Sequence, residues 1–523
     1  MQPHVTEQWQ ITKPAVHGKN GMVASQHHLA SDVGAEVLNQ GGNAIDAAIA
    51  TGLALGTVEP WMSGIGGGGY MTIYLAREKT VKVVEFGMRA PFASVPEDYP
   101  LAPQGENSSD AFNWPAVVDD RNVEGPLSIA VPGYVRGISL ALSTFGTMDW
   151  QQVIEPACRL AEEGLPIDWY SAWKINAFAR SLARFDETRR VYLADGLPPA
   201  IDLEGELRFL PLGQLGNTYR QLQEAGPDAF YRGPLAAAIV ADLQTAGSRI
   251  TLDDLAAYEA RINEPLSTRY RDATLYVAGN LTAGPSIIAA LELLQQKLQP
   301  STPLPCPSAY TAYAESLLET YRYRLENLGE GPEQPGNTSH ICAVDRAGNV
   351  VSLTQTIMSG FGSRIMLPQS GILMNNGMMW FDPRPGGPNS VEGGRHPLCN
   401  MCPVIADEGN GSLFAAGACG GRKIFPAVFQ LVSFLVDYGM SVDAAVHQPR
   451  IDNSGTDLIT IMDQMPAEVV AALAEEFPAT RLRPNGVSPN FFALPQVIRR
   501  KPDGIAEGGC FVPSPHAKVS VPG

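Results

Sequence analysis

One stretch of the sequence, residues 336–356, constrains the fold more than any other, because it has the pattern of a complete β-hairpin. Residues 340–345 and 350–356 are rich in β-branched and apolar side chains, and the Arg-Ala-Gly-Asn between them is typical of a turn. A turn of this length brings Thr338, just before the first strand, close to Thr356 at the end of the second. A slip of one residue in the register would turn Thr356 to the other face.

The threonine at the start of this hairpin is a candidate nucleophile. A threonine that begins a chain can use its own α-amine as the base, and that amine has a pKa of about 7.7 to 8.0 in model compounds. Thr338 is internal, so the bond between Asn337 and Thr338 would first have to be cut, and Gly336 would tolerate the strained backbone there. From these residues alone, an ordinary edge hairpin with surface threonines is the more common explanation.

Five motifs along the chain make a catalytic role for this hairpin the stronger explanation. The motifs are Gly-Asn-Thr-Ser-His at 336–340 with Val-Asp-x-x-Gly-Asn-Val at 344–350, Gly-Gly-Asn-Ala-Ile-Asp-Ala-Ala at 41–48, Val58-Glu59-Pro60 followed by the glycine-rich segment 63–69, Val131-Pro132-Gly133, and Ala-Cys-Gly-Gly-Arg at 418–422. Together they resemble the γ-glutamyltranspeptidase family of N-terminal-nucleophile hydrolases, and they cover the chain from about residue 21 to about residue 453.

The resemblance implies an α+β fold, the four-layer αββα sandwich of N-terminal-nucleophile hydrolases. It also implies self-cleavage between Asn337 and Thr338 into a large subunit, residues 1–337, and a small subunit, residues 338–523. We expect the two subunits to form one intertwined structural domain. By the same resemblance, the Thr356 hydroxyl bonds to that of Thr338 and aims it.

Two further residues of the expected catalytic site, Gly420 and Gly421, precede a predicted helix at 423–437. Two glycine N–H groups at a helix start attract negative charge, as the oxyanion of an acyl transfer requires. A tight strand-to-helix turn explains the two glycines equally well on sequence alone. By resemblance they match the oxyanion glycines of the family.

The substrate-binding positions depart from the family's pattern. The family's transpeptidases hold the α-carboxylate of a γ-glutamyl group with an arginine and two serines, and hold its α-amine with polar and acidic side chains. The matching positions here are Gly87, with Arg89 two residues later, then Cys399 and Asn400 for the serines, and Met358, Gly377 and Trp380 for the amine site. A buried ammonium without a carboxylate costs several kcal/mol, so this pocket does not match glutamate or glutathione.

We therefore expect an amidohydrolase that cuts the C–N bond of a small acyl donor without an α-amine, with Arg89 or Arg364 available to a carboxylate. The sequence resembles the oxamate amidohydrolase and "glutathione hydrolase-like" members of the family. Oxamate has a carboxylate and no ammonium, so it fits a site that has lost the amine-binding side chains. Glutaryl amides, the substrates of cephalosporin-type acylases, fit such a site as well. A γ-glutamyl hydrolase or transferase, C–C hydrolysis, and an uncleaved pseudoenzyme that acts as a binding protein are the alternatives.

Composition limits the partners. The net charge is −17 and no basic run is present, which argues against nucleic acid. No apolar segment approaches 18 residues, so we expect no membrane span. The absence of a signal-like start and the seven scattered cysteines predict a cytoplasmic protein with reduced thiols.

Residues 399–402 have C-x-x-C spacing without a second pair, so we expect no metal and no cofactor. The expected partners are a small-molecule substrate and the chain's own subunits, and a homo-oligomer of the cleaved unit is an open alternative.

The remaining pattern predicts the elements around the hairpin. The glycines at 64–69 match G-x-G-x-x-G but follow a helix and precede a strand, which is the reverse of a dinucleotide site. Residues 382–395 are rich in Pro and Gly and are a candidate lid. We predict helices at 30–55, 137–144, 150–163, 219–224, 234–246, 252–259, 285–298 and 309–328, strands at 70–75, 81–86 and 371–376, and a loop at 101–123.

Overall fold

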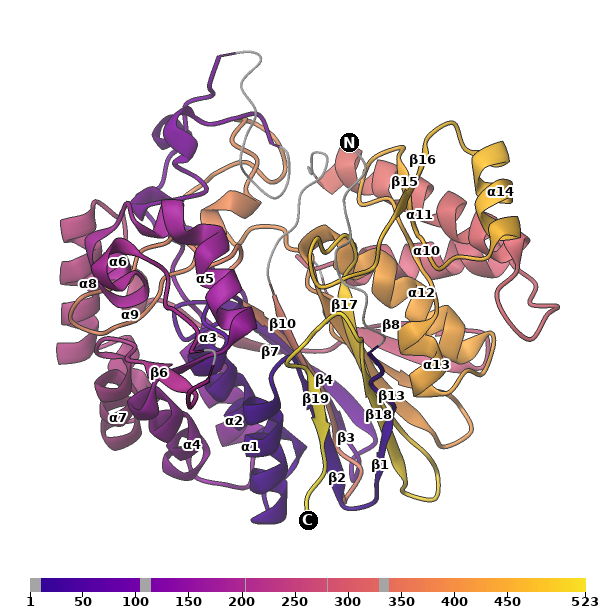
Figure 1. Ribbon diagram of the computed structural model, residues 1–523, viewed down its shortest axis with the longest axis horizontal. Coiled ribbons are helices and arrows are strands. Elements are labelled where there is room, and N and C mark those ends of the chain that lie inside the picture. Colours follow the sequence, from indigo (N-terminus) through magenta and orange to yellow (C-terminus); the bar gives the residue numbers. More distant parts are fainter. Residues whose placement is uncertain (1–10, 104–113, 203, 280, 329–337) are drawn as a thin grey trace.

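A computed structural model describes residues 11–103, 114–202, 204–279, 281–328 and 338–523. Within these ranges the chain forms two seven-stranded antiparallel sheets that pack face to face, with helices on both outer sides (Figure 1). The layers therefore run helix, sheet, sheet, helix, and the predicted four-layer α+β sandwich is confirmed.

We name the two sheets after β13 and β10, the strands that lie near the centre of each. The β13 sheet has the order β1 (Val16–Gly18), β18 (Ala506–Cys510), β17 (Leu494–Arg500), β13 (Leu413–Cys419), β12 (Val404–Asp407), β9 (Ala273–Val277) and β8 (Leu266–Tyr270). The β10 sheet has the order β19 (Lys518–Ser520), β2 (Gly21–Ser25), β10 (Ser339–Asp345), β11 (Val350–Thr356), β3 (Gly68–Leu75), β4 (Thr80–Phe86) and β7 (Arg261–Asn263). Each sheet thus mixes strands from before and after Thr338.

The helices divide into two groups (Figure 1). On the side of the β10 sheet lie α1 (His28–Asn39), α2 (Ala44–Val58), α3 (Tyr134–Phe145), α4 (Trp150–Glu163), α5 (Trp169–Leu182), α6 (Asp186–Tyr192), α7 (Leu215–Ala225), α8 (Pro234–Ala246) and α9 (Leu252–Ala256). On the side of the β13 sheet lie α10 (Gly284–Lys297), α11 (Pro307–Leu328), α12 (Ile424–Val436), α13 (Val442–His447) and α14 (Ala467–Glu476). Two small sheets, β5 (Leu165–Ile167) with β6 (Arg208–Leu210) and β14 (Ile451–Asp452) with β15 (Ile459–Met462) and β16 (Thr480–Arg483), complete the described part.

The hairpin that the sequence predicts is present as β10 and β11. Gly348 adopts φ +94°, and the Asp345 carboxylate accepts hydrogen bonds from the N–H groups of Gly348 and Asn349, which closes the turn. Ser339 pairs with Gln355 across the two strands. The register is therefore fixed, and Thr338 lies one residue beyond the last pair, level with Thr356.

The buried helix that the sequence predicts near residue 50 is present, but its start is different. All fifteen residues of α2 are buried, as expected for a helix of small apolar residues. The single helix predicted at 30–55 is wrong, because the chain breaks at Gly41, with φ +96°, and starts again at Asn43. Asn43 and Asp46 form a reciprocal capping box that begins α2.

The strand predicted at 371–376 is also wrong. This segment forms one isolated bridge, between Met366 and Leu373, and then a 3₁₀ turn at Gly377–Trp380. The Asn375 side chain bonds to Gly66 and Ala130, so side-chain hydrogen bonds hold this segment where sheet pairing was expected.

The other predicted helices correspond to α3, α4 and α7–α12 within a few residues, whereas α5, α6, α13 and α14 were not predicted. The predicted strands at 70–75 and 81–86 correspond to β3 and β4. No helix of the described residues is long and apolar enough to cross a membrane, and no group of three metal-ligating side chains is found among them. The cytoplasmic location and the oligomeric state stay predictions.

Candidate active site

The two threonines of the hairpin face the space between the two sheets. On one face of the hairpin, Ser339 and Gln355 bond to Ser63, beside α2. On the other face, the ring of His340 packs against Gly417 of the β13 sheet. Since side chains alternate along a strand, Thr338 shares the face of His340, and Thr356, level with it, shares that face too. Both threonines are buried. Asn337 lies outside the described residues.

The packing of β10 on β13 places Thr338, the candidate nucleophile, over the end of β13. The Cys342 thiol lies against the Ala415 carbonyl, and His340 lies against Gly417. Two residues further along each strand, Thr338 falls at the level of Cys419. The glycines that follow Cys419 are therefore next to Thr338.

Gly420 and Gly421 form the corner between β13 and α12. Gly420 has φ +139° and Gly421 φ +60°, a backbone that side chains other than glycine rarely adopt, and a Cβ on Gly420 would lie 3.0 Å from the backbone of Ala493. Among the described residues, neither N–H has a hydrogen-bond acceptor. Two N–H donors without acceptors beside a candidate nucleophile are what an oxyanion site provides.

Thr356 is placed to orient the nucleophile. Its hydroxyl accepts a 2.7 Å hydrogen bond from the Met358 N–H, and a hydroxyl that accepts also carries one O–H donor. Donation of that hydrogen to Thr338 would fix the Thr338 hydroxyl in one direction. This role of Thr356 stays a prediction.

We expect Thr356→Ala to slow both self-cleavage and turnover by roughly tenfold to a hundredfold, as is typical for loss of a positioning contact. Thr356→Ser should keep most activity, because the hydroxyl is the group required. Cleavage is followed on denaturing gels and turnover by amide hydrolysis. Equal losses in the two variants would show that Thr356 acts through packing of its methyl group instead.

The positions that bind an ammonium in the family lie in an apolar cluster. Met358, Trp380 and Cys399 are buried together with Tyr70, Met88, Met378 and other apolar residues. Gly377 offers no side chain, and a Cβ there would lie 2.6 Å from the Met88 sulfur. Met358, Gly377 and Trp380 themselves therefore offer no carboxylate and no side-chain amide to a cation. We call this region the apolar cluster.

Arg89, a predicted substrate ligand, lies at the edge of the apolar cluster and is held by the protein. Its guanidinium donates to the carbonyls of Asp254 and Ala257 at the end of α9 and stacks on the ring of Phe92 at 4.4 Å. Burial lowers the pKa of Arg89, and the charge of Asp254 opposes that shift. Of its donors, Nε has no partner among the described residues.

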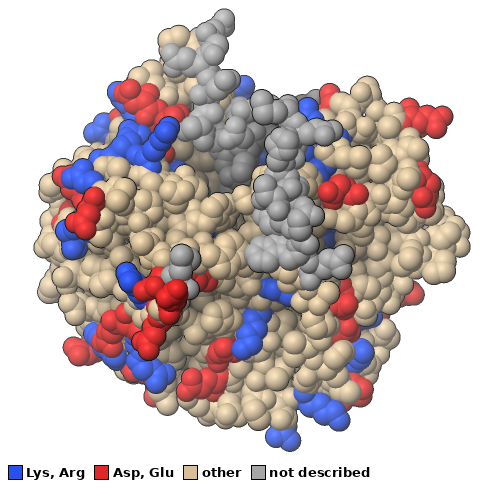
Figure 2. Space-filling view, viewed as in Figure 1, with Lys and Arg blue, Asp and Glu red and all other residues tan. Residues whose placement is uncertain are grey.

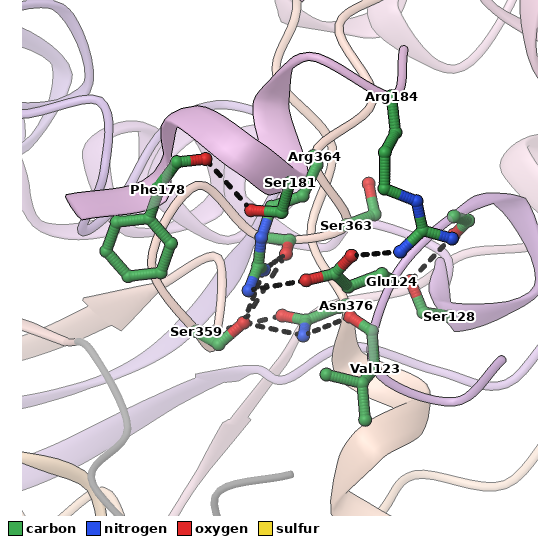
Figure 3. Close-up of polar contacts among 12 residues, drawn as sticks. Val123, Glu124, Ser128, Phe178, Ser181, Arg184, Ser359, Ser363, Arg364 and Asn376 are labelled. Atoms are coloured by element: carbon green, nitrogen blue, oxygen red, sulfur yellow. Dashed lines mark hydrogen bonds and ion pairs between the residues drawn. The ribbon is translucent and has the colours of Figure 1, made fainter. Parts of the chain in front are cut away.

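Arg364, the second predicted cation, belongs to a buried polar network (Figure 3). Its guanidinium donates to the Ser359 hydroxyl at 2.8 Å and to the Gly362 carbonyl, and lies 3.5 Å from the carboxylate of Glu124. Glu124 also pairs with Arg184 at 2.7 Å. Burial lowers the pKa of Arg364 to about 10. Substrate contacts of Arg89 and Arg364 therefore stay predictions, and both side chains already have protein partners.

The remaining predicted ligands, Cys399 and Asn400, lie beside Arg324. The Arg324 guanidinium donates to the Cys399 carbonyl and to the Asn400 side-chain oxygen. The amide nitrogen of Asn400 is buried and has no acceptor among the described residues. Asn400 can therefore still donate to a bound oxygen, as a substrate ligand would.

A cavity of about 150 Å³, which we call the Lys174 cavity, lies beside the glycine corner. Its walls include Gln26, Glu59, Lys174, Gly420 and Lys423. Gln26 accepts a 2.7 Å hydrogen bond from the His340 N–H, so the cavity begins next to the start of β10. Burial raises the pKa of Glu59 to about 8, and the charge of Lys174 and the Ser339 hydroxyl oppose that shift.

The sequence did not predict this cavity. Glu59 was noted as part of a motif without a role, and Lys174 belongs to α5, a helix that was not predicted. One signal was present, because Glu59 ends a helix whose fifteen residues are all buried, and a carboxylate at such a position needs a partner. No pattern in the sequence indicated Lys174 or Lys423.

Comparisons with known proteins agree with this geometry. A family model described as "Gamma-glutamyltranspeptidase" matches residues 30–331 and 309–510. A glutathione hydrolase proenzyme of Bacillus subtilis is 31% identical and spans 87% of this chain and 84% of its own length. An acylase ACY 1 proenzyme of a Pseudomonas species is 32% identical, over 88% and 87%. The crystal structure of a cephalosporin acylase from Bacillus halodurans superposes with a TM-score of 0.84 at 23% identity, over 100% and 99%.

Proposed function

The chain belongs to the γ-glutamyltranspeptidase family, and we propose that it is an autoprocessed amidohydrolase whose Thr338 accepts an acyl group that carries no α-amine. In this proposal the chain is cut between Asn337 and Thr338. The new α-amine of Thr338 is then the base that activates its own hydroxyl.

The residues around Thr338 support an acyl-transfer mechanism. The Thr338 hydroxyl attacks the carbonyl carbon of an amide, and the N–H groups of Gly420 and Gly421 stabilise the negative charge on its oxygen. The C–N bond breaks, and the amine leaves with the proton that the Thr338 α-amine took from the hydroxyl. Water then hydrolyses the ester to Thr338 and releases the acid.

The apolar cluster carries the proposal about the substrate. Met358, Trp380 and the side-chain-free Gly377 stand where the family's transpeptidases hold an ammonium, and Met358 and Trp380 belong to a buried cluster of apolar residues. An ammonium buried there would lose its hydration without a carboxylate in exchange. Oxamate and glutaryl amides both lack that ammonium, and we propose them as the two donors to test.

The relatives support two different classes of acyl donor. The similarity to acylase ACY 1 supports hydrolysis of an acyl donor, because that relative is named as an acylase. The similarity to glutathione hydrolase proenzymes favours a γ-glutamyl donor, which the apolar cluster argues against.

Trapping the acyl-enzyme tests the mechanism. Matured enzyme is mixed with glutaryl-p-nitroanilide or oxamate, quenched within one turnover and analysed by peptide mass spectrometry. We expect the acyl mass on the peptide that begins with Thr338. An acyl mass on any other peptide, or turnover that persists in Thr338→Ala, would refute Thr338 as the nucleophile.

A further inference from the structure

The Lys174 cavity and the apolar cluster lie on opposite sides of Thr338. In the β10 sheet the order is β2, β10, β11, β3, β4. Gln26, which follows β2, lines the cavity, whereas Met358 follows β11 and Tyr70 lies on β3, both in the apolar cluster. An amide bound at Thr338 with its acyl group in the apolar cluster therefore directs its amine toward the cavity.

The charge of the cavity favours an anion. Glu59 and Lys174 lie on its wall without a direct ion pair, and together they carry no net charge whichever of them holds the proton. Burial raises the pKa of Glu59 and lowers that of Lys174, so burial favours the uncharged form of both groups. Lys423 adds one positive charge, and no acidic side chain other than Glu59 lines the described walls.

Two buried polar atoms of the walls also lack partners. The Gln26 amide nitrogen and one carboxyl oxygen of Glu59 have no hydrogen-bond partner among the described residues, and both side chains are at least 97% buried. Buried polar groups are rarely left unsatisfied unless a ligand or water completes them. A volume of about 150 Å³ can hold a molecule the size of benzene. The cavity is therefore built for a small polar group and has no room for a folded peptide.

We propose that the Lys174 cavity is the leaving-group subsite and that it binds a carboxylate carried by the departing amine. The substrate is then an N-acyl amino acid or a similar N-acyl amino carboxylate. This inference rests on the proposed function, because it takes Thr338 as the nucleophile. When the C–N bond breaks, the amine leaves with one proton and its carboxylate stays between Lys174 and Lys423 until the product departs.

Matched leaving groups test this inference. The matured wild-type enzyme is assayed on N-glutaryl-glycine, N-glutaryl-glycinamide and N-glutaryl-p-nitroanilide, and on the corresponding oxalyl amides. The first two differ by one carboxylate. We expect kcat/KM for the acyl-glycine to exceed that for the acyl-glycinamide by about tenfold to a hundredfold, the range of a charge-assisted contact.

Variants locate the contact. Lys174→Met and Lys423→Met should each reduce the preference for the acyl-glycine, whereas Lys297→Met, an exposed lysine of α10, should not. Glu59→Gln removes the acidic group of the cavity and should increase the preference, a direction that a merely structural role would not produce. Cleavage into two subunits shows that each variant has folded.

The outcomes separate this inference from the proposed function. Equal kcat/KM for the acyl-glycine and the acyl-glycinamide overturns the leaving-group subsite and leaves the proposed function intact. Failure to hydrolyse any amide of the set overturns the proposed function and this inference with it, because the cavity then has no leaving group to receive.

Discussion

Purified protein is expected to separate on a denaturing gel into one fragment that ends at Asn337 and another that begins at Thr338. Thr338→Ala is expected to stay a single band of 56.0 kDa. The reason is chemical, because the hydroxyl of Thr338 is the nucleophile for its own release and alanine has none. N-terminal sequencing of the smaller fragment should begin Thr-Ser-His-Ile.

The fold explains why cleavage would not separate the subunits. β10 lies between β2 and β11, and each large sheet contains strands from both sides of Thr338. The first strand of the new chain is therefore held on both edges, because β10 pairs with β11 from Ser339 onward and with β2 from Cys342 onward. We expect the two fragments to migrate together in size-exclusion chromatography and to separate under denaturing conditions alone.

Thr338→Ser is the matched control for this prediction. Serine keeps the hydroxyl, so the serine variant should still be cut, and the alanine variant should not. A wild-type chain that stays whole after long incubation, with a cooperative thermal transition that shows it is folded, would favour an uncleaved binding protein over an enzyme.

The hairpin could be predicted from sequence because its signals are local. β-Branched residues, a turn with Gly348 and an aspartate that caps the turn all point to the same structure. The turn length left the register open by one residue, and the pairing of Ser339 with Gln355 fixes it. The same holds for α2, whose small apolar residues fit burial on every side. Elements of this kind need no knowledge of distant residues.

One of the two wrong predictions of secondary structure has a cause that lies far away in the sequence. The segment 371–376 is apolar enough for a strand, yet Asn375 and Asn376 bond to the backbone of Gly66, Ala130 and Val123, far away in the sequence. The other wrong prediction, the helix break at Gly41, has a local signal. Asn43 and Asp46, three residues apart, have the pattern of a capping pair and could have predicted a helix start there.

One part of the candidate site could be predicted from the sequence and another part could not. Thr338 and Thr356 are joined by a hairpin, so their proximity followed from the sequence. The Lys174 cavity is assembled from α2, α5, the end of β13 and the segment after β2. No spacing in a single chain indicates that Glu59 and Lys174 share a cavity, and packing alone brings them together.

The second large effect concerns the acyl donor. We expect the matured enzyme to hydrolyse glutaryl-p-nitroanilide about a thousandfold more efficiently than γ-glutamyl-p-nitroanilide. The two substrates differ in the α-amine alone. An ammonium placed against Met358 and Trp380 would be buried without a carboxylate, and a penalty of about 4 kcal/mol corresponds to about a thousandfold in kcat/KM. Oxamate is the third substrate of the comparison.

The backbone offers a reciprocal test at Met358. This residue has φ +89°, a left-handed conformation that is uncommon for methionine and several-fold more frequent for asparagine. The family's transpeptidases have an asparagine at the matching position. Met358→Asn should therefore fit the backbone and supply a side-chain oxygen for an ammonium, so that γ-glutamyl-p-nitroanilide gains roughly tenfold relative to glutaryl-p-nitroanilide. Met358→Leu, which adds no acceptor, is the control.

Variants of Arg89 and Arg364 test whether the carboxylate of the acyl group contributes to substrate binding. Arg89 and Arg364 already bond to the protein, so Arg89→Ala and Arg364→Ala should weaken glutaryl and oxamate hydrolysis only if the substrate takes up their remaining donors. In either case the preference against the γ-glutamyl donor should persist, because it arises from the apolar cluster. Efficient hydrolysis of γ-glutamyl-p-nitroanilide by the wild type would refute this account, since a group other than Met358, Gly377 and Trp380 would then have to hold the amine.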